Sequence, residues 1–413
     1  MKSVPNLKKI KVVWLCHFAN DEIINYFESP QVNEFAPWIS KLMDLVKGND
    51  EIELHIVAPN VFTNTSCGFI KDGINYHFYK VVPISKNNHF LTRLYNLLQV
   101  EIFTNFYWIK RKIHNIVQDI NPDIIHLHGA ENSYYSAGIL SLIDRYPVLT
   151  TIQGFIRNTS YTNFNINKRI AIEEDIIKRS NHIGVRTNEM SRLVKELNPS
   201  ANLHFHNYPL EIPTEIKENI GKDEPIDCLF FARVEKDKGI EDLLESISII
   251  KKSHPNINVK IIGSADKTYL QYLNDICAKS DIRSNVKFLG FLPAQEDIYP
   301  YILKSKMCVL PTYHDILPGT ILISMFMKLP VVAYAVGGIP ELNNDGDNII
   351  LVNKQDVNQL SKSIIMLLEN DIYRKELAER AYIYAFKQFN NNKIIPDIFK
   401  AYREILKESN IVL

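Results

Sequence analysis

The chain of 413 residues has few cysteines, no long apolar run and no net charge. Its five cysteines, Cys16, Cys67, Cys228, Cys277 and Cys308, are widely scattered. They form no CxxC pair or Cys/His cluster, so no metal site is expected. Three of them lie in apolar runs, which predicts buried thiols in a reducing compartment. No run reaches the length of a membrane span, and the N-terminal apolar run is too short for a secretory signal. We expect a cytoplasmic protein.

Other absences narrow the function. Lys plus Arg and Asp plus Glu each number 47, giving a formal net charge of +0, which argues against nucleic acid as a main partner. No GxGxxG follows an expected strand, so an NAD-dependent oxidoreductase is disfavoured. No Ser/His/Asp or Cys/His constellation indicates nucleophilic catalysis. No cofactor is expected.

What the chain does have is a regular alternation of short apolar runs and longer helical patterns in both halves. This alternation predicts parallel sheets built from βαβ units, hence an α/β fold with two Rossmann-like domains. Residues 206–225 are polar and proline-bearing, which places a linker at 209–225 between domains at 1–208 and 226–392. The expected strands are residues 10–16, 51–57, 74–80, 123–127, 147–152, 182–186, 226–231, 257–262, 285–289, 307–310, 330–334 and 348–352. The expected helices of the first half are residues 34–47, 90–118, 131–144, 167–180 and 188–197.

Two features of the second half are suited to an anionic ligand. Arg233 and Lys238 flank a turn after the strand 226–231, and Gly239 then begins an amphipathic helix. Basic side chains at that place could clamp a diphosphate, although solvated loop charges are the plainer interpretation. Gly319 and Thr320, after Pro318, begin another helix whose free N–H groups could hold phosphate or sugar oxygens. The plainer interpretation there is a surface helix without a ligand.

The segments ARVEKDKG (232–239), HDILPGTILI (314–323) and VGGIPE (336–341) resemble the donor-site signature of retaining GT-B glycosyltransferases of the family 4, or group 1, type. The resemblance implies two domains facing across a cleft, with the helix 393–413 crossing back to the first domain. It implies sugar transfer from a nucleotide-diphosphate donor to a hydroxyl, without a metal. Arg233 and Lys238 would bind the diphosphate, and Asp315 the donor sugar. Where the family carries a second Glu that binds ribose, this chain has Ile323.

Polar residues of the first half complete the predicted site. His128 ends the run PDIIHLHG and, by the resemblance, contacts the transferred sugar as a catalytic residue; a lone His at a strand end is otherwise often structural. Gln153, in TTIQGFIRN, is expected to bind acceptor or donor. His17 and Asn20, in CHFANDEI, are expected in the acceptor site, with loop capping as the alternative.

The acceptor expected from the resemblance is a saccharide or lipid-linked saccharide. Residues 86–118 combine aromatic and basic side chains, so the first domain could sit on the inner face of a membrane, or this could be a helix that faces the core. The leading interpretation is a hexosyltransferase of polysaccharide or glycolipid biosynthesis. The alternatives are a catalytically weak GT-B subunit that binds a partner or glycan, favoured by Ile323, and a sugar-nucleotide epimerase, for which no convincing set of carboxylates is found.

Overall fold

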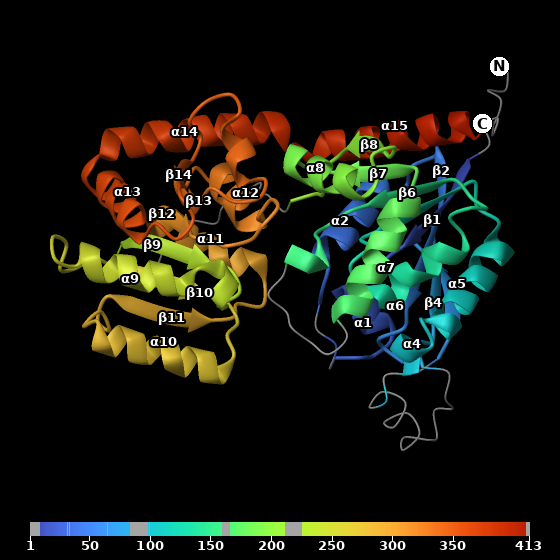
Figure 1. Cartoon of the computed structure of the whole chain (residues 1–413), viewed down its shortest axis with the longest axis horizontal. Helices are drawn as coiled ribbons and strands as arrows, with labels where there is room; N and C mark the ends of the chain where they lie inside the picture. The colour runs from blue at the N-terminus through green and yellow to red at the C-terminus, as the bar shows by residue number, and fades with distance from the viewer. Residues whose placement is uncertain are drawn as a thin grey trace. The chain divides into compact units, whose positions relative to one another are not determined.

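The computed structural model describes residues 9–30, 32, 34–63, 65–82, 98, 100–158, 166–210 and 225–409. The chain divides into two compact units (Figure 1). Unit 1 comprises Met1–Arg186, Ser191–Pro209 and Asn391–Leu413, and unit 2 comprises Thr187–Met190 and Leu210–Asn390. Most of the expected linker, residues 211–224, lies outside the described residues.

Unit 1 is built on an eight-stranded sheet, counted over the described residues, in the order β3-β4-β2-β1-β5-β6-β7-β8. All neighbouring strands pair in parallel except β3 and β4, which pair antiparallel. The chain winds outward from β1 in one direction, returns, and continues from β5 in the other, so β1 and β5 are neighbours at a topological switch point. The strands are β1 (Ile10–Leu15), β2 (Ile52–Pro59), β3 (Cys67–Lys71), β4 (Ile74–Tyr79), β5 (Ile124–His128), β6 (Val148–Thr151), β7 (His182–Val185) and β8 (Asn202–Phe205).

The helices of unit 1 are shorter than the sequence pattern suggested. The prediction of a single helix at 90–118 is wrong for the part of this range that the structure describes. Asn105 and Phe106 adopt left-handed φ angles of 52° and 56°, and they separate α4 from α5. The helix expected at 131–144 is a short α-helix that tightens into a 3₁₀ helix at Ala137–Ser141. The helices are α1 (Asp21–Tyr26), α2 (Pro37–Val46), α4 (Val100–Phe103), α5 (Tyr107–Ile120), α6 (Ser133–Ser136), α7 (Ile166–Arg179), the unit 1 part of α8 (Asn188–Leu197) and α15 (Asn391–Glu408).

Helix α15 belongs to unit 1 although it follows unit 2 in the sequence, and Figure 1 shows it in red beside the blue and green strands. Its buried face includes Ile398, Tyr402 and Ile405. The Tyr402 hydroxyl accepts a hydrogen bond from Trp14 Nε1 at 2.9 Å, so α15 is bonded to β1 inside the core. Both side chains are fully buried, so removing the Tyr402 side chain would leave the Trp14 N–H as an unpaired polar group in the core.

Unit 2 contains a six-stranded parallel sheet, counted over the described residues, in the order β11-β10-β9-β12-β13-β14. Here β9 and β12 are the neighbours at the switch point. The strands are β9 (Ile226–Phe231), β10 (Val259–Ile262), β11 (Val286–Gly290), β12 (Ser305–Leu310), β13 (Val331–Tyr334) and β14 (Ile350–Val352). The helices are α9 (Ile240–Ile250), α10 (Lys267–Lys279), α11 (Tyr299–Lys304), α12 (Gly319–Phe326), α13 (Val357–Glu369) and α14 (Asp371–Gln388).

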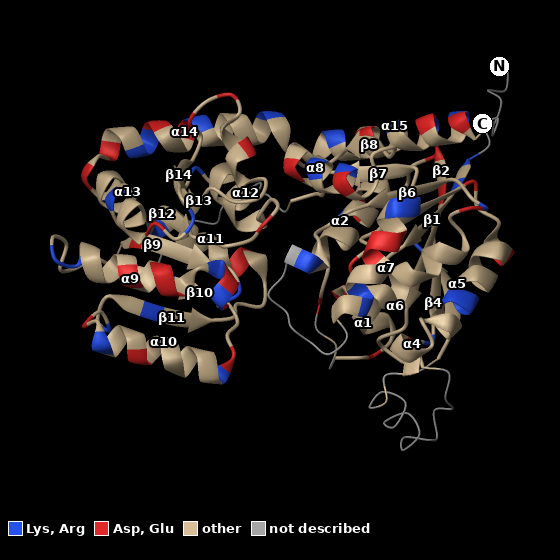
Figure 2. Ribbon diagram, in the orientation of Figure 1, with Lys and Arg blue, Asp and Glu red and all other residues tan. Residues whose placement is uncertain are grey.

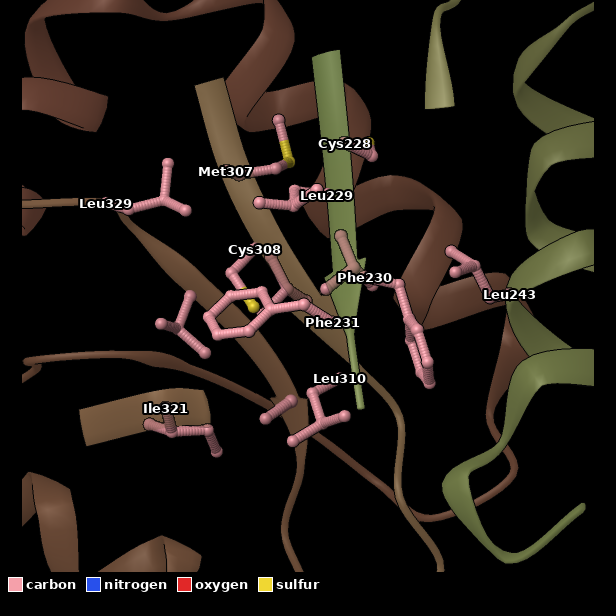
Figure 3. Packing of buried hydrophobic residues seen from close by; sticks show 14 of the residues in the cluster. Cys228, Leu229, Phe230, Phe231, Leu243, Met307, Cys308, Leu310, Ile321 and Leu329 are labelled. Carbon is pink, nitrogen blue, oxygen red and sulfur yellow. The ribbon is translucent and has the colours of Figure 1, made fainter. Parts of the chain in front are cut away.

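The core of unit 2 explains why its strands are nearly continuous apolar runs. A parallel sheet covered on both faces buries successive side chains on either side. Leu229 and Phe230 of β9 and Cys308 and Val309 of β12 are all fully buried. Figure 3 shows the side chains of these two central strands packed against those of neighbouring helices. The rigid pair β9–β12 therefore fixes where the loops at its carboxyl end begin.

The α/β fold class is confirmed: the unit 2 sheet is wholly parallel, and the unit 1 sheet is parallel except for β3 at its edge. Figure 2 shows charged residues of both signs on helices such as α10, α14 and α15. Within the described ranges, no helix is both long and apolar enough to cross a membrane.

Candidate functional site

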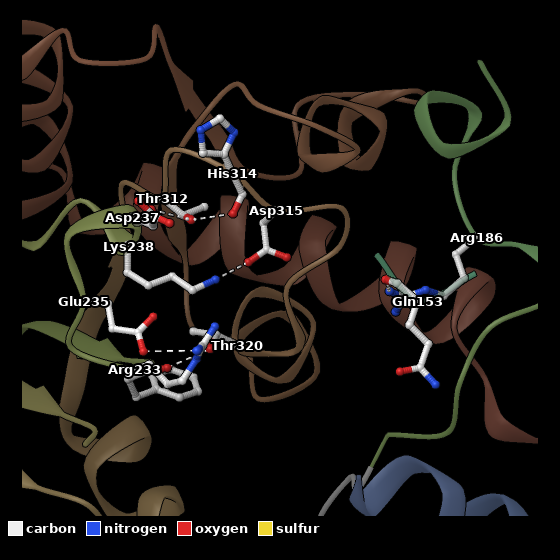
Figure 4. A network of polar contacts seen from close by, with 11 residues as sticks. Gln153, Arg186, Arg233, Glu235, Asp237, Lys238, Thr312, His314, Asp315 and Thr320 are labelled. Carbon is white, nitrogen blue, oxygen red and sulfur yellow. Dashed lines mark hydrogen bonds and ion pairs between the residues drawn. The ribbon is translucent and has the colours of Figure 1, made fainter. Parts of the chain in front are cut away.

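The carboxyl ends of β9 and β12 bring two predicted donor residues together. Lys238 follows β9, Asp315 follows β12, and Lys238 Nζ lies 2.6 Å from Asp315 Oδ2. Figure 4 shows the two side chains pointing toward one another. Their side chains are 16% and 19% exposed, so the pair is shielded but can still be reached from solvent. A switch point of this kind is where doubly wound sheets bind ligands.

The turn that carries Lys238 is held by the loop after β12. The carbonyl of Asp237 accepts hydrogen bonds from Tyr313 N at 2.7 Å and from Thr312 Oγ1 at 3.2 Å. Gly239 has a φ of +68°, and a Cβ there would lie 1.8 Å from the Pro311 carbonyl oxygen. Only glycine fits that approach. The two loops are therefore one packed unit, and Lys238 is aimed by the backbone around it.

The start of α12 lies at the same edge of the sheet. Thr320 Oγ1 donates a 2.7 Å hydrogen bond to the carbonyl of Phe231, the last residue of β9. A Cβ on the exposed Gly319 would meet no atom within 4 Å, so the backbone there faces open space. Pro318 precedes the helix as its N-cap. The Thr320 hydroxyl is thus used by the fold, which leaves the backbone N–H groups of this turn as the candidate ligand donors.

Arg233 is placed more loosely than Lys238. Its side chain is 54% exposed, and its Nη1 lies 3.1 Å from Glu235 Oε1 in the same turn. Such an exposed pair constrains the side chain little. The expected diphosphate contact of Arg233 stays a prediction.

Two glycines after β13, Gly337 and Gly338, shape the turn that carries Asp315. Gly337 has a φ of +54°, and a Cβ there would lie 1.7 Å from the Asp315 carbonyl oxygen. Gly338 N donates to the Ile316 carbonyl at 2.9 Å. The GG pair therefore sets the position of Asp315. Glu341, which follows, accepts hydrogen bonds from the amides of Asn188 and Glu189, so its carboxylate caps a helix start.

Ile323, the departure from the family pattern, packs against the hydrophobic core of unit 2. Its neighbour Ser324 donates from Oγ to the Thr320 carbonyl at 2.9 Å, inside α12. Neither side chain offers a charged hydrogen-bond acceptor.

In unit 1, His128 ends β5 at the switch point and is fully enclosed. It is 1% exposed, and neither ring nitrogen has a hydrogen-bond partner within the described structure. The centroid of its ring lies 3.7 Å from that of the His126 ring and 4.8 Å from that of the Trp14 ring. Burial holds the pKa of His128 well below its ordinary value, so the imidazole is neutral at pH 7. A buried polar side chain without a partner requires an explanation, and a ligand contact is one.

His126 shares the face of His128 but has a structural role. Its Nδ1 lies 2.7 Å from the Tyr402 hydroxyl and its Nε2 lies 2.7 Å from Thr151 Oγ1. Thr151 Oγ1 in turn lies 2.9 Å from His206 Nε2. Burial lowers the pKa of His126 and lowers that of His206 to about 3, so both rings are neutral members of a buried network. This network supports the ring on which His128 stacks.

The predicted acceptor residues hold the loops around the same switch point. Gln153 Nε2 donates to the His128 carbonyl at 3.1 Å. Asn20 Oδ1 accepts from Ile23 N at 3.0 Å and caps α1, as the capping alternative expected. His17 Nδ1 lies 3.3 Å from Asn132 Nδ2. The acceptor roles of these residues stay predictions.

Two buried carboxyls in unit 1 were missed at the sequence level. Burial raises the pKa of Glu131 to about 7 and that of Glu173 to about 8. The Glu131 carboxyl folds over Gly129, where an added Cβ would lie 2.7 Å from its Oε1. Glu173 is 1% exposed and accepts hydrogen bonds from Ile156 N. Sequence offers no signal for either shift, since burial of a helix or loop carboxyl depends on tertiary packing.

Across the described part of the chain, no three His, Cys, Asp or Glu side chains gather as a metal site would require.

Residues 211–384 match the family model described as glycosyl transferases group 1. The chain is 22% identical over 348 residues to N-acetyl-alpha-D-glucosaminyl L-malate synthase of Bacillus anthracis, covering 82% of this chain and 89% of that protein. Its fold is similar to sucrose-phosphate synthase from Thermosynechococcus elongatus, with a TM-score of 0.69, 15% identity and coverage of 97% and 100%. It is also similar to Anabaena HepE in complex with UDP, with a TM-score of 0.67, 15% identity and coverage of 96% and 100%.

Proposed function

Because this chain is a group 1 glycosyltransferase with the GT-B fold, we propose that it is a retaining hexosyltransferase that uses a nucleoside diphosphate sugar. The acceptor is a hydroxyl of a saccharide or a lipid-linked saccharide, in polysaccharide or glycolipid biosynthesis. The observation that carries the proposal is Lys238, shielded and fixed at the β9–β12 switch point beside the start of α12. The similarity to a protein solved with UDP supports a nucleotide donor.

Charge neutralisation is the main contribution proposed for unit 2. Lys238 and Arg233 offset the charge that develops on the leaving diphosphate, and the N–H groups of Gly319 and Thr320 add the positive end of the α12 dipole. These groups are fixed before the reaction, so they need little reorganisation during it. The proposal requires no metal ion.

Asp315 is proposed to accept hydrogen bonds from hydroxyls of the donor sugar. Retention without a protein nucleophile requires the acceptor oxygen to approach the anomeric carbon on the face that the diphosphate leaves. His128, neutral because burial lowers its pKa, contacts the transferred sugar. Its ring packs at a tilt against His126 and meets Trp14 edge to face, and these contacts fix the ring plane. His17, Asn20 and Gln153 are proposed to surround the acceptor.

A lipid-linked acceptor is supported by the surface of α4 and α5. Phe103, Tyr107 and Trp108 are 69%, 52% and 39% exposed, and Arg111 is exposed beside them. Lys168 Nζ lies 5.5 Å from the centroid of the Phe103 ring. Aromatic and basic side chains together suit the headgroup region of an anionic membrane. The protein would then act from the cytoplasm at the inner membrane face. Residues 86–97 and 99 of this predicted surface lie outside the described residues.

Sedimentation with liposomes tests the membrane contact. Wild-type protein should sediment with anionic liposomes and less with neutral ones, and Phe103→Ser with Trp108→Ser should abolish the difference. Phe386→Ser is the matched control, because Phe386 is 56% exposed on α14 of unit 2. Failure to bind at any salt concentration would end the membrane part of the proposal.

Thermal stabilisation by UDP-, GDP- and ADP-sugars tests donor use. A shift with one nucleotide series, followed by donor hydrolysis and NMR assignment of the product anomer, would support the proposal. An inverted anomer would contradict retention.

The second candidate function is a binding subunit with weak catalysis. It is favoured by Ile323, which stands where the family has a Glu, because each hydrogen bond to a charged acceptor contributes about 1.5–3 kcal/mol. No shift and no hydrolysis across the panel would favour that candidate.

A further inference from the structure

We propose that Asn132 is a positioning residue that fixes His17 as an Nε2–H donor for a hydroxyl oxygen of the acceptor. The proposal rests on the glycosyl transfer proposed above and deepens its acceptor site. The two residues join the loops that follow β1 and β5, the neighbouring strands at the unit 1 switch point.

The orientation of the Asn132 amide follows from its other contact. Tyr134 N lies 3.2 Å from Asn132 Oδ1 and can only donate, so the oxygen must face it. This bond caps the N-terminus of α6. The amide nitrogen is thereby turned to His17 Nδ1, at 3.3 Å. A flipped amide would place two donors against each other at the cap.

The position of the proton on His17 then follows. An amide NH₂ can only donate, so His17 Nδ1 must be the acceptor. Burial lowers the pKa of His17 to about 4, so the ring is neutral at pH 7 and carries one proton. That proton is on Nε2. The loop geometry thus selects one of the two neutral tautomers.

His17 Nε2 has no hydrogen-bond partner within the described structure and is shielded from solvent, although the ring as a whole is only partly buried. A buried N–H without an acceptor is destabilising, and a ligand oxygen that accepted from it would remove that cost. The ring packs against Phe35, with centroids 4.5 Å apart, and lies 6.1 Å from Tyr135. Tyr135 donates to the His128 carbonyl at 2.7 Å, which connects this ring to the predicted catalytic residue.

The alternative is that Asn132 only caps α6. Two substitutions separate the roles. Asn132→Ser keeps a good N-cap residue but is too short to reach His17. Asn132→Asp also keeps the cap, but its second oxygen accepts, and so draws the proton to Nδ1.

The test uses imidazole ¹⁵N NMR of the full chain, with the His17 signals assigned by their loss in His17→Gln. Wild type should show an Nε2-protonated ring that shifts when glycerol is added as a hydroxyl probe. Asn132→Asp should move the proton to Nδ1 and lose the glycerol response. Wild-type protonation at Nδ1, or a wild-type Nε2 signal that ignores glycerol, would overturn the proposal.

Kinetics provide the second readout. With the donor found in the nucleotide-sugar panel, Asn132→Asp should lower kcat/KM for transfer to glycerol at least tenfold, mainly through KM. Hydrolysis of the same donor should stay within twofold of wild type, and Asn132→Ser should lie between. If both variants transferred to glycerol with the wild-type kcat/KM, Asn132 would serve only as the N-cap of α6. Absence of any donor binding would contradict the proposed function while leaving the NMR result to decide the role of Asn132.

Discussion

Lys238 Nζ and Asp315 Oδ2 form a 2.6 Å ion pair across the β9–β12 switch point. The cation proposed for the diphosphate and the carboxylate proposed for the donor sugar therefore neutralise each other before a donor arrives. A donor must share or replace this bond, because a diphosphate competes for Lys238. Donor affinity then reflects the difference between two charged contacts rather than the strength of one.

Lys238→Met should weaken donor binding while keeping the aliphatic stem. Losing a charge-assisted bond costs about 1.5–3 kcal/mol, or about tenfold to a hundredfold in Kd. Isothermal titration with the nucleoside diphosphate measures the loss. Lys236→Met is the matched control, since Lys236 is exposed in the same turn. An equal loss in both variants would contradict the assignment.

Asp315→Asn should separate nucleotide binding from transfer. The substitution releases Lys238 from its partner, so the nucleoside diphosphate should bind at least as tightly as to wild type. Transfer should fall at least tenfold, because the charged acceptor for the sugar hydroxyls is lost. Titration and steady-state rates on one preparation test both halves. Weaker nucleotide binding would show that Asp315 supports the cation rather than competing with the ligand.

His126→Phe should destabilise the protein much more than His128→Phe. Within the described structure neither ring nitrogen of His128 has a hydrogen-bond partner, so a phenyl ring that keeps the ring contacts should change the free energy of unfolding by less than about 1.5 kcal/mol. His126→Phe removes two buried hydrogen bonds, so Tyr402 keeps only Trp14 and Thr151 keeps only His206 among the side-chain partners described, which should cost about 2–5 kcal/mol. Transfer should fall at least about a hundredfold in His128→Phe. Denaturant unfolding measures the change in stability, and steady-state rates measure the change in transfer. Strong destabilisation of His128→Phe would show that His128 has a structural role.

Glu173→Gln should flatten the pH dependence of stability between pH 7 and 8. Burial raises the pKa of Glu173 in the folded chain to about 8, so the folded state keeps a proton that the unfolded state releases near pH 4.5. Stability therefore falls as pH rises through this window, by about 1 kcal/mol from this group. Gln keeps an oxygen for Ile156 N. Denaturant midpoints at several pH values measure the slope.

The shifted pKa values of His17 and Glu131 affect stability mainly below pH 7. Burial lowers the pKa of His17 to about 4, so its effect is a loss of stability as pH falls below 6.5. Glu131, with a pKa raised to about 7, acts mainly below pH 7. An unchanged slope in Glu173→Gln between pH 7 and 8 would show that another group is responsible.

Gly239→Ala should disturb both folding and donor binding. The left-handed φ of +68° costs an alanine about 1–2 kcal/mol, and the 1.8 Å approach of the Pro311 oxygen adds a clash. Gly290→Ala provides the comparison, because Gly290 has a similar φ of +77° with no atom near its added Cβ. Melting temperature should drop further in Gly239→Ala, and nucleotide affinity should fall only there. Equal drops would mean that the Pro311 loop yields easily.

The sequence predicted the central strands well because buried parallel strands are apolar throughout. It missed β3 and β8, which lie at the two edges of the unit 1 sheet. Both are partly exposed and lack a strong apolar run, so their pairing is set by neighbouring strands rather than by local pattern.

For the site, the sequence indicated which loops matter but not which atoms are already engaged. Lys238 and Asp315 are far apart along the chain, and their pairing depends on how two loops pack. Similarly, the Thr320 hydroxyl donates a hydrogen bond to the Phe231 carbonyl, a contact that no local sequence pattern predicts. The Asn132–His17 contact joins two switch-point loops and depends on β1 and β5 being neighbours in the sheet, which no local sequence pattern encodes.

The bond between Trp14 and Tyr402 has a consequence for synthesis on the ribosome. Unit 1 begins the chain but needs α15, which is translated after all of unit 2. Until then the indole N–H of Trp14 and the ring of His126 lack the phenol that completes them. Domains usually fold in the order in which they emerge. Unit 2 can therefore complete its fold first, while part of the unit 1 core stays exposed to chaperones until α15 has been synthesised.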